Sequence, residues 1–189
     1  MVGSAVTQFL IRACRERQEF VDYLLERIPG AVVIYDTNRN AMDTFRAALA
    51  AAGDGPAVHM EDDIILTRRF TEKVEAAIAE RPHMPIQFFS MRKADLTVGS
   101  REEPGRTFLM GQCFYLPAGM SRELLAYRWP RLREHPTGLD LMVADFMRER
   151  RMRYWLHVPS LVQHRRGKSL IDPRRSSYRQ SLTFEEPDL

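Results

Sequence analysis

Cysteines, glycine-rich loops and long apolar stretches are all scarce in this sequence. Its two cysteines, Cys14 and Cys113, have no metal-ligand spacing, so we expect free thiols in a reducing compartment. No apolar run is long enough for a membrane-spanning helix, and no charged segment followed by an apolar core marks a signal peptide. We therefore expect a cytoplasmic protein that does not associate with membranes. Neither Gly-x-Gly-x-x-Gly nor Gly-x-x-x-x-Gly-Lys-Ser/Thr occurs, which argues against a Rossmann dehydrogenase and a P-loop NTPase.

Lysine is also scarce, and the positive charge is carried by arginine. The only lysines are Lys73, Lys93 and Lys168. Residues 121–179 hold 14 of the 28 lysine and arginine residues but only 6 of the 25 acids. Arginine makes bidentate contacts with phosphate, and the aromatic residues Tyr154, Trp155 and Tyr178 lie among these arginines. This region favours contact with phosphate groups, although solvated surface charges would give the same composition.

The first half of the chain alternates between strand and helix patterns. Apolar runs predict strands at 6–11, 31–35, 57–60 and 86–90, and helical periodicity predicts helices at 15–28, at 42–52 and after a capping Thr67. This alternation predicts an α/β fold whose mixed, mainly parallel sheet has helices on both faces.

The second half is less regular. The charged, glycine-containing residues 91–107 are expected to form a loop or flap beside a site. Strand composition returns at 108–116 and 154–158, and helices are expected from Ser121 to Tyr127 and over 138–150. We expect one domain, residues 1–172, followed by a basic and then acidic tail, residues 173–189, of which 184–189 would be mobile.

Three consecutive acids, Glu61-Asp62-Asp63, interrupt the apolar sequence between two hydrophobic runs. Charges in such a place are rarely buried unless they are paired or bind a metal ion. The acids follow a predicted strand, and ligands of open α/β sheets bind at the carboxyl ends of strands. Arg12 and Asp36 are expected at the same edge. The sequence therefore predicts a divalent cation that binds phosphate; the alternative is a solvated turn with acids that cap a helix.

Three segments, taken in order, resemble the GT-A-fold glycosyltransferases that use nucleotide sugars. His59-Met60-Glu61-Asp62-Asp63-Ile64 resembles the DXD-type metal motif of that family. The acid in Thr137-Gly138-Leu139-Asp140-Leu141 is similar in position to the catalytic base of inverting members. Val158-Pro159-Ser160-Leu161-Val162-Gln163-His164, followed by Gly167 and Ser169, resembles a Pro-Ser-Leu-Val-x-His segment of small transferases. The resemblance covers about residues 5–172.

The resemblance implies a GT-A-like, or Rossmann-like, domain that transfers a sugar from a nucleoside-diphosphate sugar, with UDP favoured. Asp63 and His164 would bind Mn²⁺ or Mg²⁺, while Glu61 or Asp62 lies close to the metal or the ribose. Asp140 would be the catalytic base, although it could instead cap its helix. For His164, the alternative is a surface histidine in a basic tail.

Other residues could complete a nucleotide site. Arg12 and Asp36 could bind the base and ribose, or could form an ion pair with each other. Arg165, Arg166 and Lys168 could contact the diphosphate, or could be solvated charges of the tail. His59, within a predicted strand, is expected to be a core side chain.

The basic second half suggests DNA as the acceptor, for instance a hydroxymethylated base in viral DNA that would be extruded from the duplex. Saccharide, lipid-linked and protein acceptors remain alternatives. Two further function classes are a non-catalytic nucleic-acid-binding module, which would need no acid triplet, and a metal-dependent nuclease or phosphatase, which usually has carboxylates for two metals.

Overall fold

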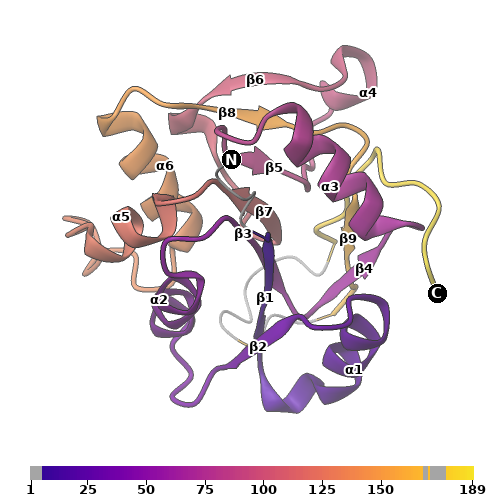
Figure 1. Cartoon of the computed structure of the whole chain (residues 1–189), viewed down its shortest axis with the longest axis horizontal. Helices are drawn as coiled ribbons and strands as arrows, with labels where there is room; N and C mark the ends of the chain where they lie inside the picture. Colours follow the sequence, from indigo (N-terminus) through magenta and orange to yellow (C-terminus); the bar gives the residue numbers. More distant parts are fainter. Residues whose placement is uncertain (1–5, 168–169, 171–177) are drawn as a thin grey trace.

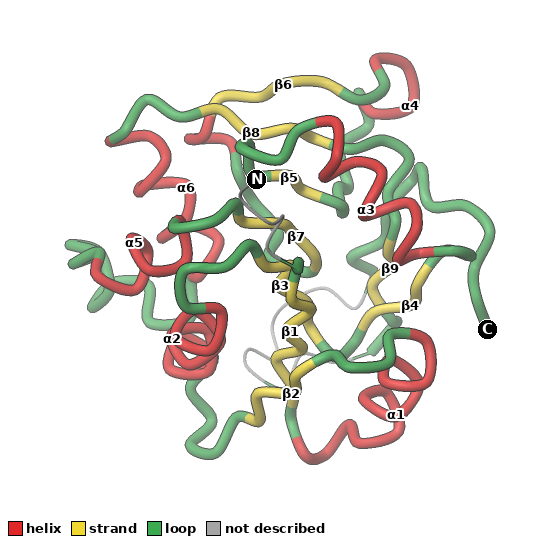
Figure 2. Tube along the Cα trace, viewed as in Figure 1, coloured by secondary structure: helices red, strands yellow, loops and turns green. Residues whose placement is uncertain are grey.

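Alternating strands and helices build the first half of the molecule, as the sequence predicts. The computed structural model describes residues 6–167, 170 and 178–189. Figure 1 and Figure 2 show the arrangement of the elements. The strands are β1 Gln8–Ala13, β2 Val32–Tyr35, β3 Ala57–Glu61, β4 Ile64–Leu66, β5 Ile86–Gln87, β6 Arg101–Pro104, β7 Cys113–Leu116, β8 Arg153–Leu156 and β9 Val162–His164. The helices are α1 Gln18–Arg27, α2 Ala41–Ala52, α3 Phe70–Glu80, α4 Asp95–Val98, α5 Met120–Ala126 and α6 Leu139–Glu149, with short 3-10 turns η1 Arg15–Arg17 and η2 Gly105–Thr107.

Within the described residues, the main sheet has seven strands in the order β2-β1-β3-β7-β5-β8-β6. β1 is parallel to β2 and β3, and β5 is parallel to β8. β7 runs antiparallel to its neighbours β3 and β5, and β6 runs antiparallel to β8. All strands except β7 and β6 therefore point in one direction, which confirms the prediction of a mixed, mainly parallel sheet.

Helices cover both faces of this sheet (Figure 1). α1 and α3 pack on one face, where Leu24 and Val74 join strand residues in one apolar cluster. α2, α5 and α6 pack on the other face, where Phe45 belongs to a second cluster. Side chains of a strand alternate between faces, and β3 accordingly sends Val58 and Met60 to the first cluster. His59 faces α2 and stacks on a phenylalanine of β7, which confirms that it is a core residue.

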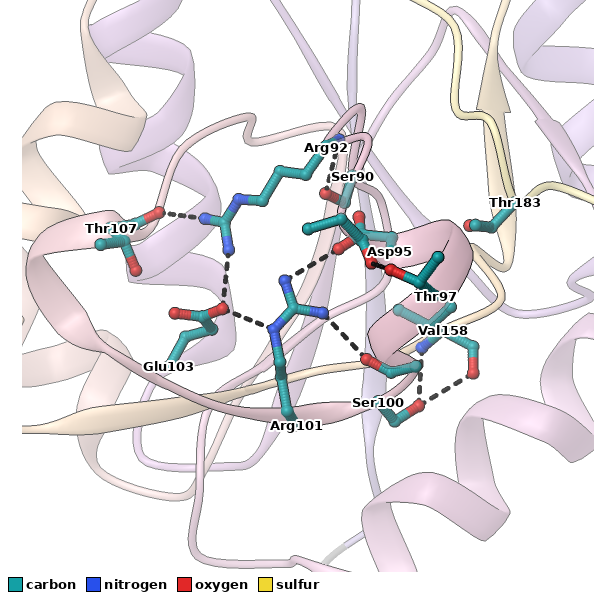
Figure 3. Close-up of polar contacts among 12 residues, drawn as sticks. Ser90, Arg92, Asp95, Thr97, Ser100, Arg101, Glu103, Thr107, Val158 and Thr183 are labelled. Carbon is teal, nitrogen blue, oxygen red and sulfur yellow. Dashed lines mark hydrogen bonds and ion pairs between the residues drawn. The ribbon is translucent and has the colours of Figure 1, made fainter.

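Residues 91–107 are not the loop or flap that the sequence predicts, since they form α4, β6 and η2 and complete an edge of the sheet. The charges that suggested a loop are paired with each other (Figure 3). Arg101 contacts Asp95 at 2.9 Å and Glu103 at 2.7 Å, and Arg92 contacts Glu103 at 3.3 Å. Because these partners come from the same segment, a charged sequence can be folded against the sheet.

The expected strand 108–116 is shorter, because only β7 pairs with its neighbours. Before it, side chains rather than a strand bind the backbone carbonyls. Gln87 donates to the carbonyls of Leu109 and Met110, and Arg12 donates to that of Gly111. Met110 has a positive φ of 74°, so the chain turns here instead of continuing as a strand.

The last residues are not mobile as expected, but pack against the strand–helix connection after β4. The Asp188 N–H donates to the Leu66 carbonyl at 2.9 Å, and the Arg68 N–H donates to the Glu186 carbonyl at 2.8 Å. The Thr67 hydroxyl donates to the Glu185 carbonyl instead of capping α3. These backbone bonds explain how an acidic terminus is ordered without an apolar sequence of its own.

Candidate functional site

A small two-stranded sheet brings together the acid triplet and His164, which are far apart in the sequence. β4 begins directly after the acids and pairs antiparallel with β9, so that Ile64 lies opposite His164. The Arg165 N–H donates to the Asp63 carbonyl at 2.7 Å and extends this pairing. As a result His164 Nε2 lies 3.3 Å from Asp63 Oδ2. The alternative of a surface histidine in a tail is wrong, because His164 is only 2% exposed.

The acids themselves are enclosed, which rules out the alternative of a solvated turn. Asp62 and Asp63 are 3% and 5% exposed. Glu61, the last residue of β3, is the most accessible of the three. Burying ionised carboxylates is costly unless other groups compensate their charge, so their partners determine what the site can do.

Two arginines and a backbone amide compensate the acids. One terminal nitrogen of Arg17 lies 2.9 Å from Asp62 Oδ1 and 2.7 Å from Asp63 Oδ2. The Cys14 N–H donates to Asp62 Oδ2 at 2.7 Å. Arg12 lies 3.9 Å from Glu61. Arg17 follows β1 in η1, so the loop at the end of β1 supplies the charge that holds the acid turn.

The three carboxyl groups differ in acidity because their surroundings differ. Burial raises the pKa of Asp62, although the hydrogen bond from the Cys14 amide and the charge of Arg17 act to lower it. Burial also raises the pKa of Glu61, and the negative charge of Asp63 adds to this. Burial opposes ionisation of Asp63 too, but the hydrogen bond and charge of His164, together with Arg17, lower its pKa. Asp63 is therefore the acid that stays ionised most readily and is the best placed to bind a cation.

The donor set fits a divalent cation. Glu61, Asp63 and His164 each offer one ligand atom, and these atoms lie within 4.8 Å of one another. Among the described residues, the buried atoms Asp63 Oδ1 and His164 Nδ1 have no hydrogen-bond partner. Buried polar atoms are normally satisfied, and an ion bound by Asp63 would satisfy its free oxygen. Two carboxylates and an imidazole suit Mn²⁺, and also Mg²⁺ with more water in its shell.

Glu61, Asp62 and Asp63 line a pocket at the carboxyl ends of β1, β2 and β3. Its empty volume is about 590 Å³, part of it open to solvent. The acid triplet forms one side, and Arg12, Arg17 and Arg179 bring positive charge to it. Asp36 also lines the pocket, and its Oδ1 accepts hydrogen bonds from two backbone amides of the turn that follows β2. The pocket thus combines a cation site with basic groups suited to an anionic ligand.

The fold is similar to that of A197 from STIV. The two structures superpose with a TM-score of 0.50 at 15% sequence identity, over 92% of each chain. The chain is also similar to a glycosyltransferase involved in the glycosylation of the major capsid of PBCV-1, with a TM-score of 0.36 and 12% identity over 80% of this chain and 94% of the other. No family model and no curated protein sequence matches the chain. At these identities the likeness to A197 establishes the fold and leaves the activity to the site itself.

Not every residue that the sequence suggested reaches this pocket. Arg12 does, and the alternative of an ion pair with Asp36 is wrong, because Arg12 contacts Glu61 and donates to the Gly111 carbonyl instead. The Arg165 side chain instead stacks on Phe20 and Tyr23 of α1, 4.5 and 4.7 Å from their ring centres. Lys168, also expected at the diphosphate, lies outside the described residues.

Asp140 is the second residue of α6, whose N-cap is Gly138. Its Oδ2 accepts a hydrogen bond from the Met110 N–H at 3.1 Å, and its Oδ1 accepts one from the Leu141 N–H at 3.0 Å. The neighbouring Leu139 lines the pocket. The N-cap alternative is therefore wrong, and the Asp140 carboxylate instead ties the Met110 turn to α6.

The arginines of residues 148–153 do not form an unpaired basic face. Arg148 lies 2.9 Å from Asp145, and Arg153 lies 2.9 Å from Glu102. Arg150 lies 3.6 Å from Glu123. Two of these pairs join residues that are far apart in the sequence and the third lies within α6, so a count of charges along the chain overstates the positive potential of this surface.

Arg17 and Arg179 are the pocket residues that the sequence reasoning missed. Arg17 lies in the segment 15–28, where apolar periodicity predicts a helix and leaves an arginine looking like a surface charge. Its position just after a strand that ends at the ligand edge is the signal that could have identified it. Arg179 lies in the expected tail, and nothing in its sequence context indicates a pocket residue.

Proposed function

We propose that this chain is a metal-dependent glycosyltransferase, which moves a sugar from a nucleoside-diphosphate sugar, with UDP favoured, to an acceptor hydroxyl. One observation carries the proposal: ligand atoms of Glu61, Asp63 and His164 converge within 4.8 Å of one another, and the two acids of this cluster line a pocket that arginines also line. Breaking the bond between a sugar and a diphosphate leaves extra negative charge on the diphosphate. A bound Mn²⁺ or Mg²⁺ would supply Lewis-acid neutralisation of that charge.

The chain's own residues would hold and orient the donor. Asp63 and His164 would be the protein ligands of the cation, with Glu61 beside them. Asp62 binds Arg17 and the Cys14 amide, so its role is to fix the loop after β1. Arg179 lines the pocket and would contact the diphosphate by charge.

The remaining pocket residues would select the nucleoside. Arg12 is buried between Phe45 and Phe114, and its bond to the Gly111 carbonyl fixes its position beside Glu61. Asp36 is half-buried in the lining of the pocket, where a carboxylate would accept hydrogen bonds from ribose hydroxyls.

Asp140 is the proposed general base, which would take the proton of the acceptor hydroxyl during an in-line, inverting attack. Its carboxylate is held by the Met110 and Leu141 amides. Asp140→Asn keeps the size of the side chain and one of the two acceptor oxygens, but removes the base. We expect it to lower kcat by about 10² to 10⁴ and to leave donor affinity unchanged; loss of donor binding instead would assign Asp140 to the architecture of the pocket.

For the acceptor we propose a hydroxymethylated base in DNA, because residues 121–179 hold 14 basic against 6 acidic residues, an excess that the ion pairs of Arg148, Arg150 and Arg153 reduce but do not cancel. The direct assay compares sugar transfer to DNA that contains 5-hydroxymethylcytosine with transfer to unmodified DNA. Transfer to oligosaccharides or to a hydroxyl-bearing protein, and not to the modified DNA, would replace this acceptor while keeping the transferase reaction.

The size of the ligand cluster argues against a nuclease or phosphatase activity. Such enzymes commonly place two metals about 4 Å apart. In the described part of the chain, the ligand atoms form one cluster, and the third acid, Asp62, is engaged by Arg17 and the Cys14 amide. A single cation site beside arginines fits diphosphate binding better.

Calorimetric titration tests the proposal most directly. Wild type is titrated with UDP, UDP-glucose and GDP-sugars in Mn²⁺ and then in EDTA, together with Asp63→Ala and the exposed-acid control Asp22→Ala. We expect Mn²⁺-dependent nucleotide binding in wild type and in Asp22→Ala but none in Asp63→Ala. No binding of any nucleotide under either condition would refute the transferase and direct attention to a non-catalytic nucleic-acid-binding role.

A further inference from the structure

The contacts of Arg17 conflict with cation binding at the same acids. One terminal guanidinium nitrogen lies 2.7 Å from Asp63 Oδ2 and 2.9 Å from Asp62 Oδ1. His164 Nε2 lies 3.3 Å from the same Asp63 oxygen. That oxygen therefore already has a positively charged neighbour on the side of the cluster where Arg17 enters.

We propose that Arg17 is a built-in counter-cation, which neutralises the acid cluster in the metal-free protein and competes with the divalent cation for Asp63. This inference rests on the proposed function only in taking Glu61, Asp63 and His164 as the cation site. It assigns to Arg17 a positioning role that the metal motif itself does not contain.

Charge balance supports the competition. Without Arg17, Asp62 and Asp63 would be adjacent buried carboxylates, which is unfavourable for both. Arg17 is itself mostly enclosed, with a side chain that is 17% exposed. A divalent cation at Asp63 would place a second positive charge close to the guanidinium. The two cations repel, so binding of the metal would weaken the Arg17–Asp63 contact.

The contact of Arg17 with Asp62 would persist after a cation has displaced Arg17 from Asp63. Asp62 is also held by the Cys14 amide at 2.7 Å, so the Asp62–Arg17 pair belongs to the loop after β1 and does not depend on Asp63. Arg17 lines the pocket in which the diphosphate would bind. Once it leaves Asp63, its guanidinium keeps Asp62 as a partner and offers its remaining donors to an anion.

This arrangement predicts that removing Arg17 changes the affinities for the cation and for the diphosphate in opposite directions. Removing Arg17 removes a competitor of the cation but also a partner of the diphosphate. A purely structural arginine would behave differently, because its loss would weaken both ligands together. The comparison therefore separates a competing counter-cation from a residue that only supports the fold.

The test is calorimetric titration of Mn²⁺ alone, and of UDP in saturating Mn²⁺, on wild type, Arg17→Ala and Arg17→Gln. The matched control is Arg15→Ala, an exposed arginine of the same turn that stacks on Tyr35. Thermal unfolding is recorded with and without Mn²⁺. We expect the neutral variants to bind Mn²⁺ about 10- to 100-fold more tightly than wild type, since charged hydrogen bonds of this kind contribute amounts of that order. UDP affinity should fall, and the metal-free form should unfold at a lower temperature, with Mn²⁺ restoring it.

The second neutral variant keeps the test decisive if Arg17→Ala fails to fold, since glutamine retains hydrogen bonds but no charge. Unchanged or weaker Mn²⁺ binding in a folded variant, with Mn²⁺-dependent UDP binding in wild type, would overturn the role of Arg17 and leave the transferase intact. Mn²⁺ binding by the variants but not by wild type would support the competition in its strongest form. Failure of all four proteins to bind Mn²⁺ or UDP would overturn both this inference and the proposed function.

Discussion

His164 Nε2 lies 3.3 Å from Asp63 Oδ2, although more than half of the chain separates the two residues. The antiparallel pairing of β4 with β9 creates this contact, since it sets Ile64 opposite His164. The proposed cation site therefore depends on a local two-stranded sheet as much as on its candidate ligands. The structure leads to four predictions about the site and its support.

Replacing His164 with alanine should remove a cation ligand without disturbing β9, whose backbone makes the pairing with β4. Even partners in the second shell of a metal contribute about 10- to 100-fold to affinity, so loss of a direct ligand should weaken Mn²⁺ by at least about tenfold. Calorimetric titration of Mn²⁺ measures this, with the exposed His83→Ala as control. Equal Mn²⁺ affinity in the two variants would remove His164 from the site.

The buried His59 should make stability depend on pH. Burial lowers its pKa from 6.5 to about 3, so the folded state keeps it neutral while the unfolded chain binds a proton below pH 6.5. Stability should therefore fall as pH decreases from 6.5 towards 3, by about 2–3 kcal/mol between pH 7 and 4.5 from this residue alone. Urea unfolding of His59→Phe, which keeps an aromatic ring beside Phe114, should show a smaller loss. A pH dependence identical to wild type would contradict this assignment.

Gly105 should tolerate no side chain. A Cβ there would overlap Met147 Cβ and would lie 2.9 Å from the Met152 carbonyl oxygen, where α6 passes η2. Overpacking of this kind costs about 1–3 kcal/mol, so Gly105→Ala should lower the free energy of unfolding by that amount. Gly55→Ala is the control, because its Cβ would meet no atom closer than 3.4 Å. Equal urea midpoints for the two variants would show that α6 can move away from η2.

The ordered C-terminus can be tested by hydrogen exchange and by deletion. The Asp188 amide donates to the Leu66 carbonyl and should exchange slowly, unlike an amide in a solvated tail. Deleting residues 184–189 removes several such bonds, each contributing about 1 kcal/mol, and should lower stability by about 1–3 kcal/mol in urea unfolding. If the Asp188 amide exchanges fast and the deletion leaves stability unchanged, the expectation from the sequence that residues 184–189 are mobile would be correct.

Local patterns predict the first half of this fold well. Apolar runs and helical periodicity are properties of short segments, and they locate β1, β2, β3 and the helices between them within a few residues. They do not show that β7 is inserted antiparallel between β3 and β5, because strand order depends on contacts between distant segments. The ion pairs of Arg101 illustrate the same limit: a charged segment resembles a loop until its partners are known.

The residues of the candidate site also differ in whether the sequence alone identifies them. Glu61, Asp62 and Asp63 were identifiable because an acid triplet at the end of a buried strand is costly without compensation. His164 was found only through resemblance to a family motif, since its sequence context is that of a basic tail. For Arg17 the only signal is its position just after a strand that ends at the ligand edge, and for Arg179 there is none, because an arginine next to solvent and one facing buried acids look alike in sequence.

The pairing of β4 with β9 also sets an order of events during synthesis. A chain leaves the ribosome from its N-terminus, and its early segments fold first. Arg17 and the acids both leave the ribosome long before His164. Arg17 is therefore available to bind the acids earlier than His164 is. A partly synthesised chain would hold its acids through Arg17 and would acquire its complete metal site only when β9 has been made.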